Sequence, residues 1–119
     1  MNNLIIYFSE DSDLVEAECV MKEWRGDILV SCDGALYLID CITVNRLNKE
    51  FELAQEDDRV YSINNTVVVE SVKKACIVKA IVKLVESNLI TTFTTIDLRQ
   101  HYSDAFPHLH DISNWKRVY

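Results

Sequence analysis

Glycine and proline are scarce in this chain, with Gly26, Gly34 and Pro107 the sole examples among 119 residues. Flexible linkers and low-complexity segments are rich in these residues, so the sequence leaves little room for either. We also find no internal repeat with the period of a solenoid. Two isolated glycines cannot build a glycine-rich phosphate loop, which argues against nucleotide hydrolysis. We therefore expect residues 1–119 to form a single domain.

Long apolar runs and a basic leader are missing as well. The N-terminus reads Met-Asn-Asn-Leu-Ile-Ile-Tyr-Phe-Ser-Glu, and the apolar run at 4–8 ends before the acidic residues begin. A secretory signal peptide has a basic start and a longer apolar core, and a membrane span needs about 20 mostly apolar residues. We therefore expect no signal peptide, no membrane contact and a cytoplasmic protein.

Cysteine occurs at four widely spaced positions, Cys19, Cys32, Cys41 and Cys76. Without a secretion signal, we expect reduced thiols packed as small apolar side chains rather than two disulfides. A nucleophilic thiol needs a lowered pKa, whereas the acidic surroundings of the first three cysteines would raise it. This pattern argues against thiol catalysis.

Apolar residues make up 49% of the chain, and their spacing predicts both strands and helices. Strands are predicted at residues 4–8, 28–32, 35–39, 60–63 and 66–69. Asp33-Gly34 and Asn64-Asn65 are typical of tight turns between neighbouring strands. The unbroken apolar run at 67–69 indicates a central strand covered on both faces.

Helices are predicted at residues 45–54, 71–87 and 96–105. The first places Leu47, Phe51 and Ala54 on one side and is followed by an exposed acidic loop at 55–58. The second has the clearest signal, one broad apolar stripe with Lys79 and Lys83 on its solvated face.

Residues 14–24 fit two structures. As a helix, they would begin with a capping box of Asp13 and Glu16 and end near Gly26. As a strand, they alternate apolar and mostly charged side chains, and a tight turn at 25–27 leads into the next strand. We favour the strand, so the sequence predicts an α+β fold: a mostly antiparallel sheet with two to three helices packed on it.

Acidic charge is concentrated in the first half of the chain. Residues 1–58 contain 14 carboxylates and four basic side chains, a balance of −10, and residues 59–119 contain five and eight, a balance of +3, which gives the net charge of −7. Such asymmetry suits a basic protein partner and argues against direct binding of nucleic acid. The carboxylates are too abundant to single out an acid–base pair.

One cluster near the C-terminus has metal-ligand chemistry, and it consists of His101, Asp104, His108, His110 and Asp111. Its spacing matches neither a structural zinc site nor an HExxH helix, and a polar loop around Pro107 explains it. We therefore expect no catalytic residue, no metal and no cofactor. A small metal-dependent enzyme built on these histidines and a structural adaptor subunit stand as alternatives.

Two tryptophans have basic neighbours: Trp24 precedes Arg25, and Trp115 precedes Lys116. Aromatic and arginine side chains dominate binding energy at protein interfaces, so both tryptophans are candidate anchors. A half-buried ring that closes the edge of the core explains each of them equally well.

The order of elements also carries a resemblance. The segments concerned are Leu14 to Lys22 taken as a strand, the turn Trp24-Arg25-Gly26-Asp27, the strand Ile28-Leu29-Val30-Ser31-Cys32, the strand Thr66-Val67-Val68-Val69-Glu70 feeding the helix at 72–87, the piece Leu98-Arg99-Gln100-His101-Tyr102, and Trp115. This order resembles the small immunity proteins that accompany bacterial polymorphic toxins, including those of contact-dependent growth inhibition. It is most similar to the immunity protein 8 type, although residues 114–119 are basic where that family is acidic and aromatic.

The resemblance implies a cytoplasmic protein that binds one cognate toxin domain, often a nuclease, and covers its active or substrate-binding surface. A nuclease groove is often basic because it holds phosphates, so carboxylates would occupy the same positions and speed the encounter. The residues expected to bind the partner are clustered acids and one aromatic anchor: Glu10, Asp11, Asp13, Glu16, Glu18, Trp24, Glu52, Glu56, Asp57 and Asp58.

Overall fold

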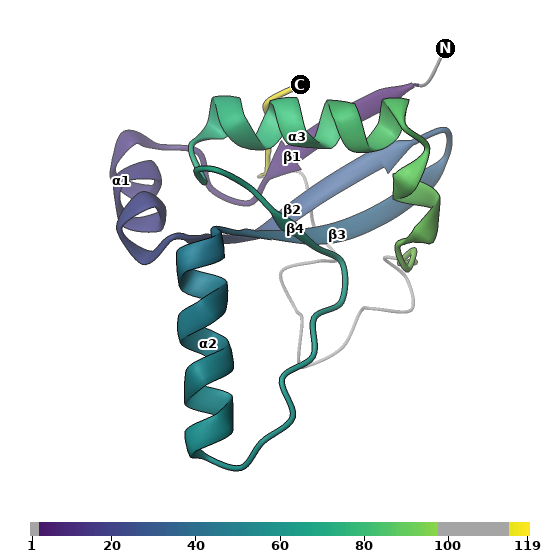
Figure 1. The fold of residues 1–119 in the computed structure, drawn as a ribbon. Helices are drawn as coiled ribbons and strands as arrows, with labels where there is room; N and C mark the ends of the chain where they lie inside the picture. The colour runs from purple at the N-terminus through teal and green to yellow at the C-terminus, as the bar shows by residue number, and fades with distance from the viewer. Residues whose placement is uncertain (1–2, 98–114) are drawn as a thin grey trace.

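A five-stranded sheet forms the centre of the part of the chain that the structure describes (Figure 1). The structure is a computed structural model that describes residues 3–97 and 115–119. In chain order the elements are β1 (Leu4–Phe8), α1 (Asp13–Lys22), β2 (Trp24–Cys32), β3 (Ala35–Ile42), α2 (Val44–Glu56), β4 (Thr66–Val68), α3 (Lys74–Glu86), the 3₁₀ turn η1 (Leu89–Thr92) and β5 (Lys116–Arg117). The predicted α+β fold, a mostly antiparallel sheet with three α-helices, is confirmed.

The strands have the order β4-β3-β2-β1-β5, and β3–β4 is the parallel pair among them. β2 and β3 form a hairpin in which Cys32 pairs with Ala35 across Asp33-Gly34. Both turn residues have positive φ, 51° at Asp33 and 86° at Gly34, as a type I′ turn requires. The hairpin predicted from this dipeptide is therefore confirmed.

The main core lies between one face of the sheet and α3, which lies across that face (Figure 1). Alternate residues of β1, β2 and β3 point toward α3, because successive side chains in a strand point to opposite faces. The helix contributes the row Ile77, Ile81 and Val85, all buried, while Lys79 and Lys83 are exposed as predicted. On the other face, Leu29 packs with Trp115. Trp115 is 9% exposed, so it closes the core and is not an exposed anchor.

The prediction of a strand at residues 14–22 is wrong, because this segment forms α1. Ser12 caps the helix by accepting a hydrogen bond at Oγ from the Val15 N–H, at 3.2 Å, so the cap lies one residue before the predicted Asp13. Glu23 ends the helix in the left-handed conformation, with φ 58°. No side chain of α1 is buried. The helix therefore lacks the broad buried stripe by which amphipathic helices are recognised in a sequence. Its alternation of apolar and charged residues favoured a strand instead.

The predicted turn at 25–27 is a bulge inside β2. The pairing of β2 with β3 shifts register between Arg25 and Ile28, and Asp27 has φ 53°. A Cβ on Gly26 would lie 2.6 Å from the Trp24 ring, so glycine lets the indole lie directly over the backbone.

Four other expectations, which concern residues 55–105, have different outcomes. Residues 60–63 form no strand, and β4 is an edge strand with Val68 43% exposed rather than a central one. The acidic loop predicted at 55–58 is the end of α2 and a two-residue turn. Of the helix predicted at 96–105, residues 96–97 are not helical and the rest lies outside the described residues.

Candidate functional site

The ten residues expected to bind a partner fall into two acidic segments and one tryptophan. The first acidic segment, residues 10–18, leads into α1 and forms its beginning. The second, residues 50–58, forms the distal half of α2 and the turn beyond it. Each segment contains five carboxylates and no basic side chain. The structure gives them different surroundings.

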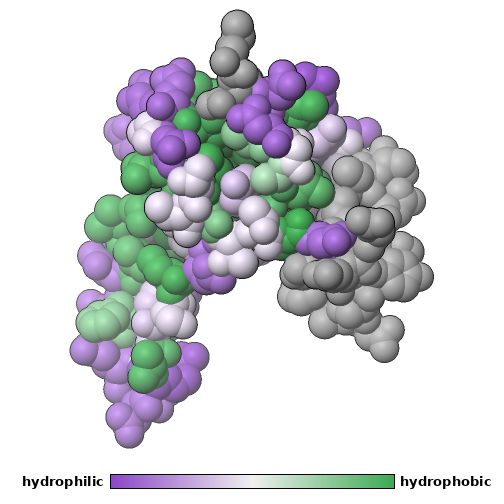
Figure 2. All heavy atoms as spheres, turned by 90° about the vertical axis from the view of Figure 1, so that its right-hand side faces the viewer, coloured by the Kyte–Doolittle hydropathy of each residue, from purple (hydrophilic) through white to green (hydrophobic). Residues whose placement is uncertain are grey.

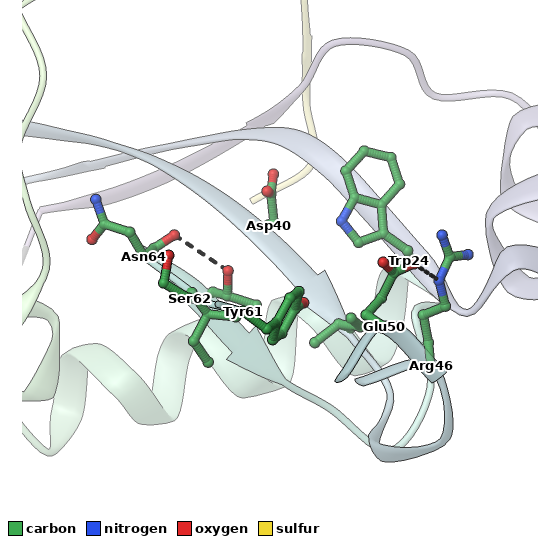
Figure 3. A pocket seen from close by; sticks show the side chains of 10 residues that line it. Trp24, Asp40, Arg46, Glu50, Tyr61, Ser62 and Asn64 are labelled. Atoms are coloured by element: carbon green, nitrogen blue, oxygen red, sulfur yellow. Dashed lines mark hydrogen bonds and ion pairs between the residues drawn. The ribbon is translucent and has the colours of Figure 1, made fainter. Parts of the chain in front are cut away.

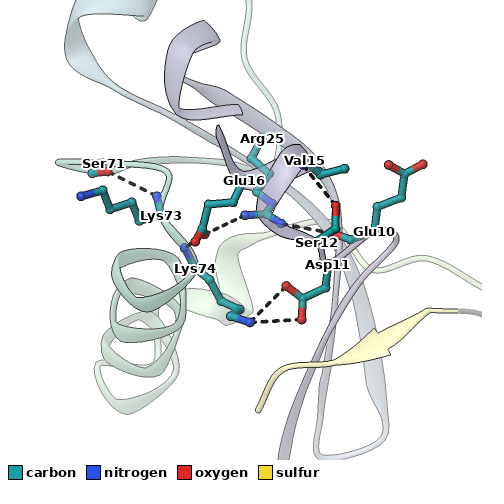
Figure 4. Close-up of polar contacts among 9 residues, drawn as sticks. All are labelled: Glu10, Asp11, Ser12, Val15, Glu16, Arg25, Ser71, Lys73 and Lys74. Atoms are coloured by element: carbon teal, nitrogen blue, oxygen red, sulfur yellow. Dashed lines mark hydrogen bonds and ion pairs between the residues drawn. The ribbon is translucent and has the colours of Figure 1, made fainter. Parts of the chain in front are cut away.

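Carboxylates of the first segment bind basic groups of their own fold (Figure 4). Glu16 Oε1 lies 3.3 Å from the Arg25 guanidinium and accepts the backbone N–H of Lys74 at 2.6 Å. Lys74 Nζ lies 3.1 Å from Asp11. Arg25 also donates to the backbone carbonyl of Glu10 at 3.2 Å, and its guanidinium carbon lies 4.2 Å from the centre of the Phe8 ring. The segment thus fastens α1 to β2 and to the start of α3.

The Glu16 contact has a clear structural purpose. The Arg25 side chain is 3% exposed, and a buried guanidinium needs an anionic partner. The N-cap residue of α3, Lys73, has no side-chain cap, so Glu16 satisfies an N–H of that helix terminus from another element. Asp13, Glu18 and the side chain of Glu10 are exposed, and within the described residues they form no ion pair.

Helix α2 projects away from the sheet, and the chain returns alone from its far end to β4 (Figure 1). We call α2 and the return up to Ile63, residues 44–63, the arm. Within α2, Ala54 is the one buried residue, while Phe51 is 50% and Leu53 49% exposed. On the return, Val60 is 94% exposed. Figure 2 shows hydrophobic patches on the projecting part of the molecule, with hydrophilic groups between them and at its end.

The second acidic segment lies at the distal end of this arm. Glu50 pairs with Arg46 at 2.7 Å within the helix, and Asp57 pairs with Arg59 at 3.0 Å, both of the latter being more than 60% exposed. Glu52, Glu56 and Asp58 are exposed and form no ion pair with any described residue. The arm therefore combines exposed apolar side chains with carboxylates that the fold does not neutralise.

Trp24 lies at the base of the arm, where it borders a pocket of about 390 Å³ (Figure 3). The pocket is lined by the end of the β2–β3 hairpin, by α2 and by the return segment: Trp24, Asp40, Ile42, Arg46, Glu50, Tyr61, Ser62, Ile63, Asn64 and Thr66. The indole is 40% exposed. A second, smaller hollow of about 240 Å³ lies on the side of Trp24 that faces Glu10 and Glu18. Of the two tryptophans, Trp24 is the exposed one.

Two acids line the pocket, and Asp40, unlike Glu50, has no ion-pair partner among the described residues. Burial raises the pKa of its carboxyl, the negative charge of Asp27 raises it further, and a hydrogen bond from the backbone of Asp27 acts in the opposite direction. A negative charge that is partly desolvated and lacks a cation attracts a cationic ligand.

All four cysteines lie in the described part of the chain and are free thiols. Burial, with the charge of Asp40, raises the pKa of Cys41 to about 12, and burial also raises that of Cys32. Neither has the thiolate character of a nucleophile. Within residues 3–97 and 115–119, no group of three His, Cys, Asp or Glu side chains could hold a metal ion, and the histidine cluster at 101–111 lies outside those residues.

Comparison with protein-family models, with curated proteins and with solved structures found no match to this chain. In the part of the chain that the structure describes, no helix is long and apolar enough to cross a bilayer.

The sequence pointed to both acidic segments but not to the residues that distinguish them. Arg25 and Lys74 were not identified as the partners of Glu16 and Asp11, and neither Asp40 nor Tyr61 was identified as part of a pocket. Asp40 could have been identified from the sequence. It interrupts an apolar strand just before Cys41, and a charged residue in such a strand needs a specific structural or functional reason. The pairing of Lys74 with Asp11 and Glu16 cannot be recognised from the sequence around any of these residues, because they are far apart in the chain.

Proposed function

We propose that the protein is an immunity-type inhibitor that binds the basic domain of a cognate toxin through its arm. The observation that supports this most is that α2 holds apolar and acidic side chains away from its own domain. In the alternative, a purely structural helix, the apolar stripe would pack on the sheet, as that of α3 does.

The stability of α2 supports the same conclusion. Isolated helices shorter than about 12–15 residues are marginal in water, and most protein helices are stabilised by packing of their apolar face. α2 has 13 residues and one buried side chain. Its known supports are polar: the Thr43 cap, the Arg46–Glu50 pair, and a hydrogen bond of 2.7 Å from Arg46 to the Lys22 carbonyl. A partner that covers Phe51 would supply packing that this helix lacks in the free protein.

Charge specifies the kind of partner. Glu52, Glu56 and Asp58 would meet like charge on an acidic protein and desolvate without compensation, whereas a basic surface complements them and speeds the encounter. Toxin nuclease domains present such a surface, because they bind phosphates. The proposal rests on the arm rather than on the order of elements, since one element in that order, the strand at 14–22, is a helix.

The test uses the C-terminal domain of the protein encoded directly upstream of this chain. Expressed alone in a laboratory bacterium, that domain should stop growth, and co-expression of this chain should restore it. Rescue should fail with Phe51→Asp, which places a charge in the apolar stripe, and persist with Glu86→Gln, an exposed change on α3. Growth arrest that this chain does not relieve, or an upstream domain that is harmless, would overturn the proposal.

A further inference from the structure

We infer that the pocket between Trp24 and Asp40 binds an arginine side chain of the protein partner. This inference rests on the proposed function, and it adds a defined recognition site at the base of the arm. It assigns the pocket a guanidinium ligand held by aromatic stacking and by a carboxylate.

The geometry around Gly26 brings the two groups together. A Cβ at Gly26 would lie 2.6 Å from the Trp24 ring and 3.0 Å from Asp40 Oδ1, so ring and carboxylate both border the same glycine. Figure 3 shows the edge of the indole that carries its nitrogen turned toward Asp40. These short separations leave no room for a ligand beside Gly26 itself, so a planar cation would reach the ring and the carboxylate from the pocket that both of them line.

The remaining lining supplies what a guanidinium needs. It has five N–H donors, and the side chains of Tyr61 and Ser62 bring oxygen acceptors from the return segment. The volume of about 390 Å³ falls within the range of small-molecule sites, roughly 300–1,000 Å³. Because the return segment is also part of the arm, a partner that covers the arm can extend a side chain into the pocket.

Arg46, the basic residue that lines the pocket, does not pair with Asp40. Arg46 is engaged at the rim, where its Nε donates to Glu50 at 2.7 Å and its Nη1 donates to the Lys22 carbonyl at 2.7 Å. The carboxylate of Asp40 has the like charge of Asp27 as a neighbour, and the hydrogen bond that it accepts from the Asp27 backbone offsets this repulsion in part. An external cation therefore relieves a repulsion as well as forming an ion pair.

Arginine fits better than lysine or a metal ion. Its plane stacks on an indole and its fork matches a carboxylate with two parallel hydrogen bonds, whereas an ammonium group is a strongly hydrated point charge. A hard metal ion would need several carboxylates converging on one point, and the described residues contain no such group.

The test is an NMR titration of the full chain with N-acetyl-arginine amide, using N-acetyl-citrulline amide as a neutral probe of the same shape. We expect saturable shifts of the Trp24 indole N–H with the arginine probe, and at least fivefold weaker binding of the citrulline probe. The indole of Trp115 serves as an internal reference that should not move. Equal binding of the two probes, or equal shifts of the two indoles, would overturn the inference.

Two matched variants separate charge at the pocket from charge in general. Asp40→Asn keeps the shape and an acceptor oxygen and should weaken arginine binding at least fivefold. Asp33→Asn removes the same charge in the turn at the other end of the hairpin and should leave binding unchanged. Loss of binding in both variants would indicate non-specific attraction and contradict the inference.

This experiment can fail independently of the proposed function. If Phe51→Asp abolishes rescue of growth while the arginine probe does not bind, the arm binds a toxin and the pocket does not take arginine. If the probe binds but no toxin is neutralised, the pocket is an arginine site and the proposed function is wrong.

Discussion

The two acidic segments look alike in sequence and differ in the folded protein. Residues 10–18 and residues 50–58 each carry five carboxylates and no basic side chain. In the first segment, Glu16 and Asp11 bind Arg25 and Lys74 and hold three elements together. In the second, the pairs stay within the arm, Glu50 with Arg46 and Asp57 with Arg59. Each segment also leaves three exposed carboxylates without an ion-pair partner among the described residues: Glu10, Asp13 and Glu18 in the first, and Glu52, Glu56 and Asp58 in the second. Local acidity therefore does not reveal whether a carboxylate stabilises its own fold or is available to another molecule.

The difference has a physical origin in what each segment packs against. Asp11 and Glu16 adjoin a buried arginine and a helix N-terminus, both of which are electropositive and incompletely satisfied without an anion. Among the described residues, the ion pair at the distal end of α2 joins Asp57 to Arg59 of the return segment, and both side chains are more than 60% exposed. An exposed pair of this kind contributes little and leaves the segment's field largely intact.

The largest effect on stability is expected from Glu16→Ala. It removes the anionic partner of a guanidinium that is 3% exposed and the acceptor for the Lys74 N–H, so the free energy of unfolding should fall by about 2 kcal/mol. Urea denaturation measures it. Glu18→Ala, on an exposed position of the same helix, is the control and should change stability by less than about 0.5 kcal/mol. Equal losses in both variants would mean that the first segment owes nothing to its ion pairs.

Phe51→Ala tests the opposite role for the arm. The ring is already 50% exposed in the free protein, so truncation should change the free energy of unfolding by less than about 1 kcal/mol. Binding to the toxin domain should weaken by at least about 2 kcal/mol, roughly 30-fold in Kd, because an interface would bury the ring completely. Calorimetry of both equilibria measures the two effects. A variant that loses stability and keeps its affinity would place Phe51 in the protein's own core.

Removal of three charges from each segment compares them directly. Neutralising Glu52, Glu56 and Asp58 to Gln, Gln and Asn should slow association with the toxin domain about tenfold at low salt, with the difference fading toward ~1 M salt. The matched variant neutralises the same number of exposed acids in the first segment: Glu10, Asp13 and Glu18. It should slow association less than about threefold. Stopped-flow rates at several salt concentrations measure both, and the reverse order would move the binding surface to α1.

The sequence predicted those parts of the fold that have local signals. Asp33-Gly34 specifies its turn by itself, and the apolar row of α3 specifies which side of that helix is buried. α2 was predicted for the same reason, with Phe51 on its apolar side. What the pattern could not show is that Ala54 on this side would be buried while Phe51 stays half exposed, because that depends on where the helix points after β3 ends.

The errors and omissions concern contacts between distant residues. Lys74 lies 63 positions from Asp11 and 58 from Glu16, so no window of sequence contains both members of either contact. α1 depends on those contacts more than on a buried stripe, which explains why its alternation of apolar and charged residues was misleading. The pocket likewise combines β2, β3, α2 and the return segment, and it became visible only in the structure.

The smallest expected effect is a pH dependence of stability that originates at Asp40. Burial and Asp27 raise the folded-state pKa of this carboxyl above its ordinary value, so the folded protein holds the proton to higher pH than the unfolded chain does. Stability from this group is therefore complete below the ordinary pKa and is lost as pH rises through the raised one. Asp40→Asn, which cannot ionise, should have a higher Tm than the parent near neutral pH, and the gap should shrink toward about pH 4. Thermal melts across that range measure the gap, with Asp33→Asn as the control that should show none. A gap that stays constant with pH would assign the effect to packing and not to the charge that we propose an arginine neutralises.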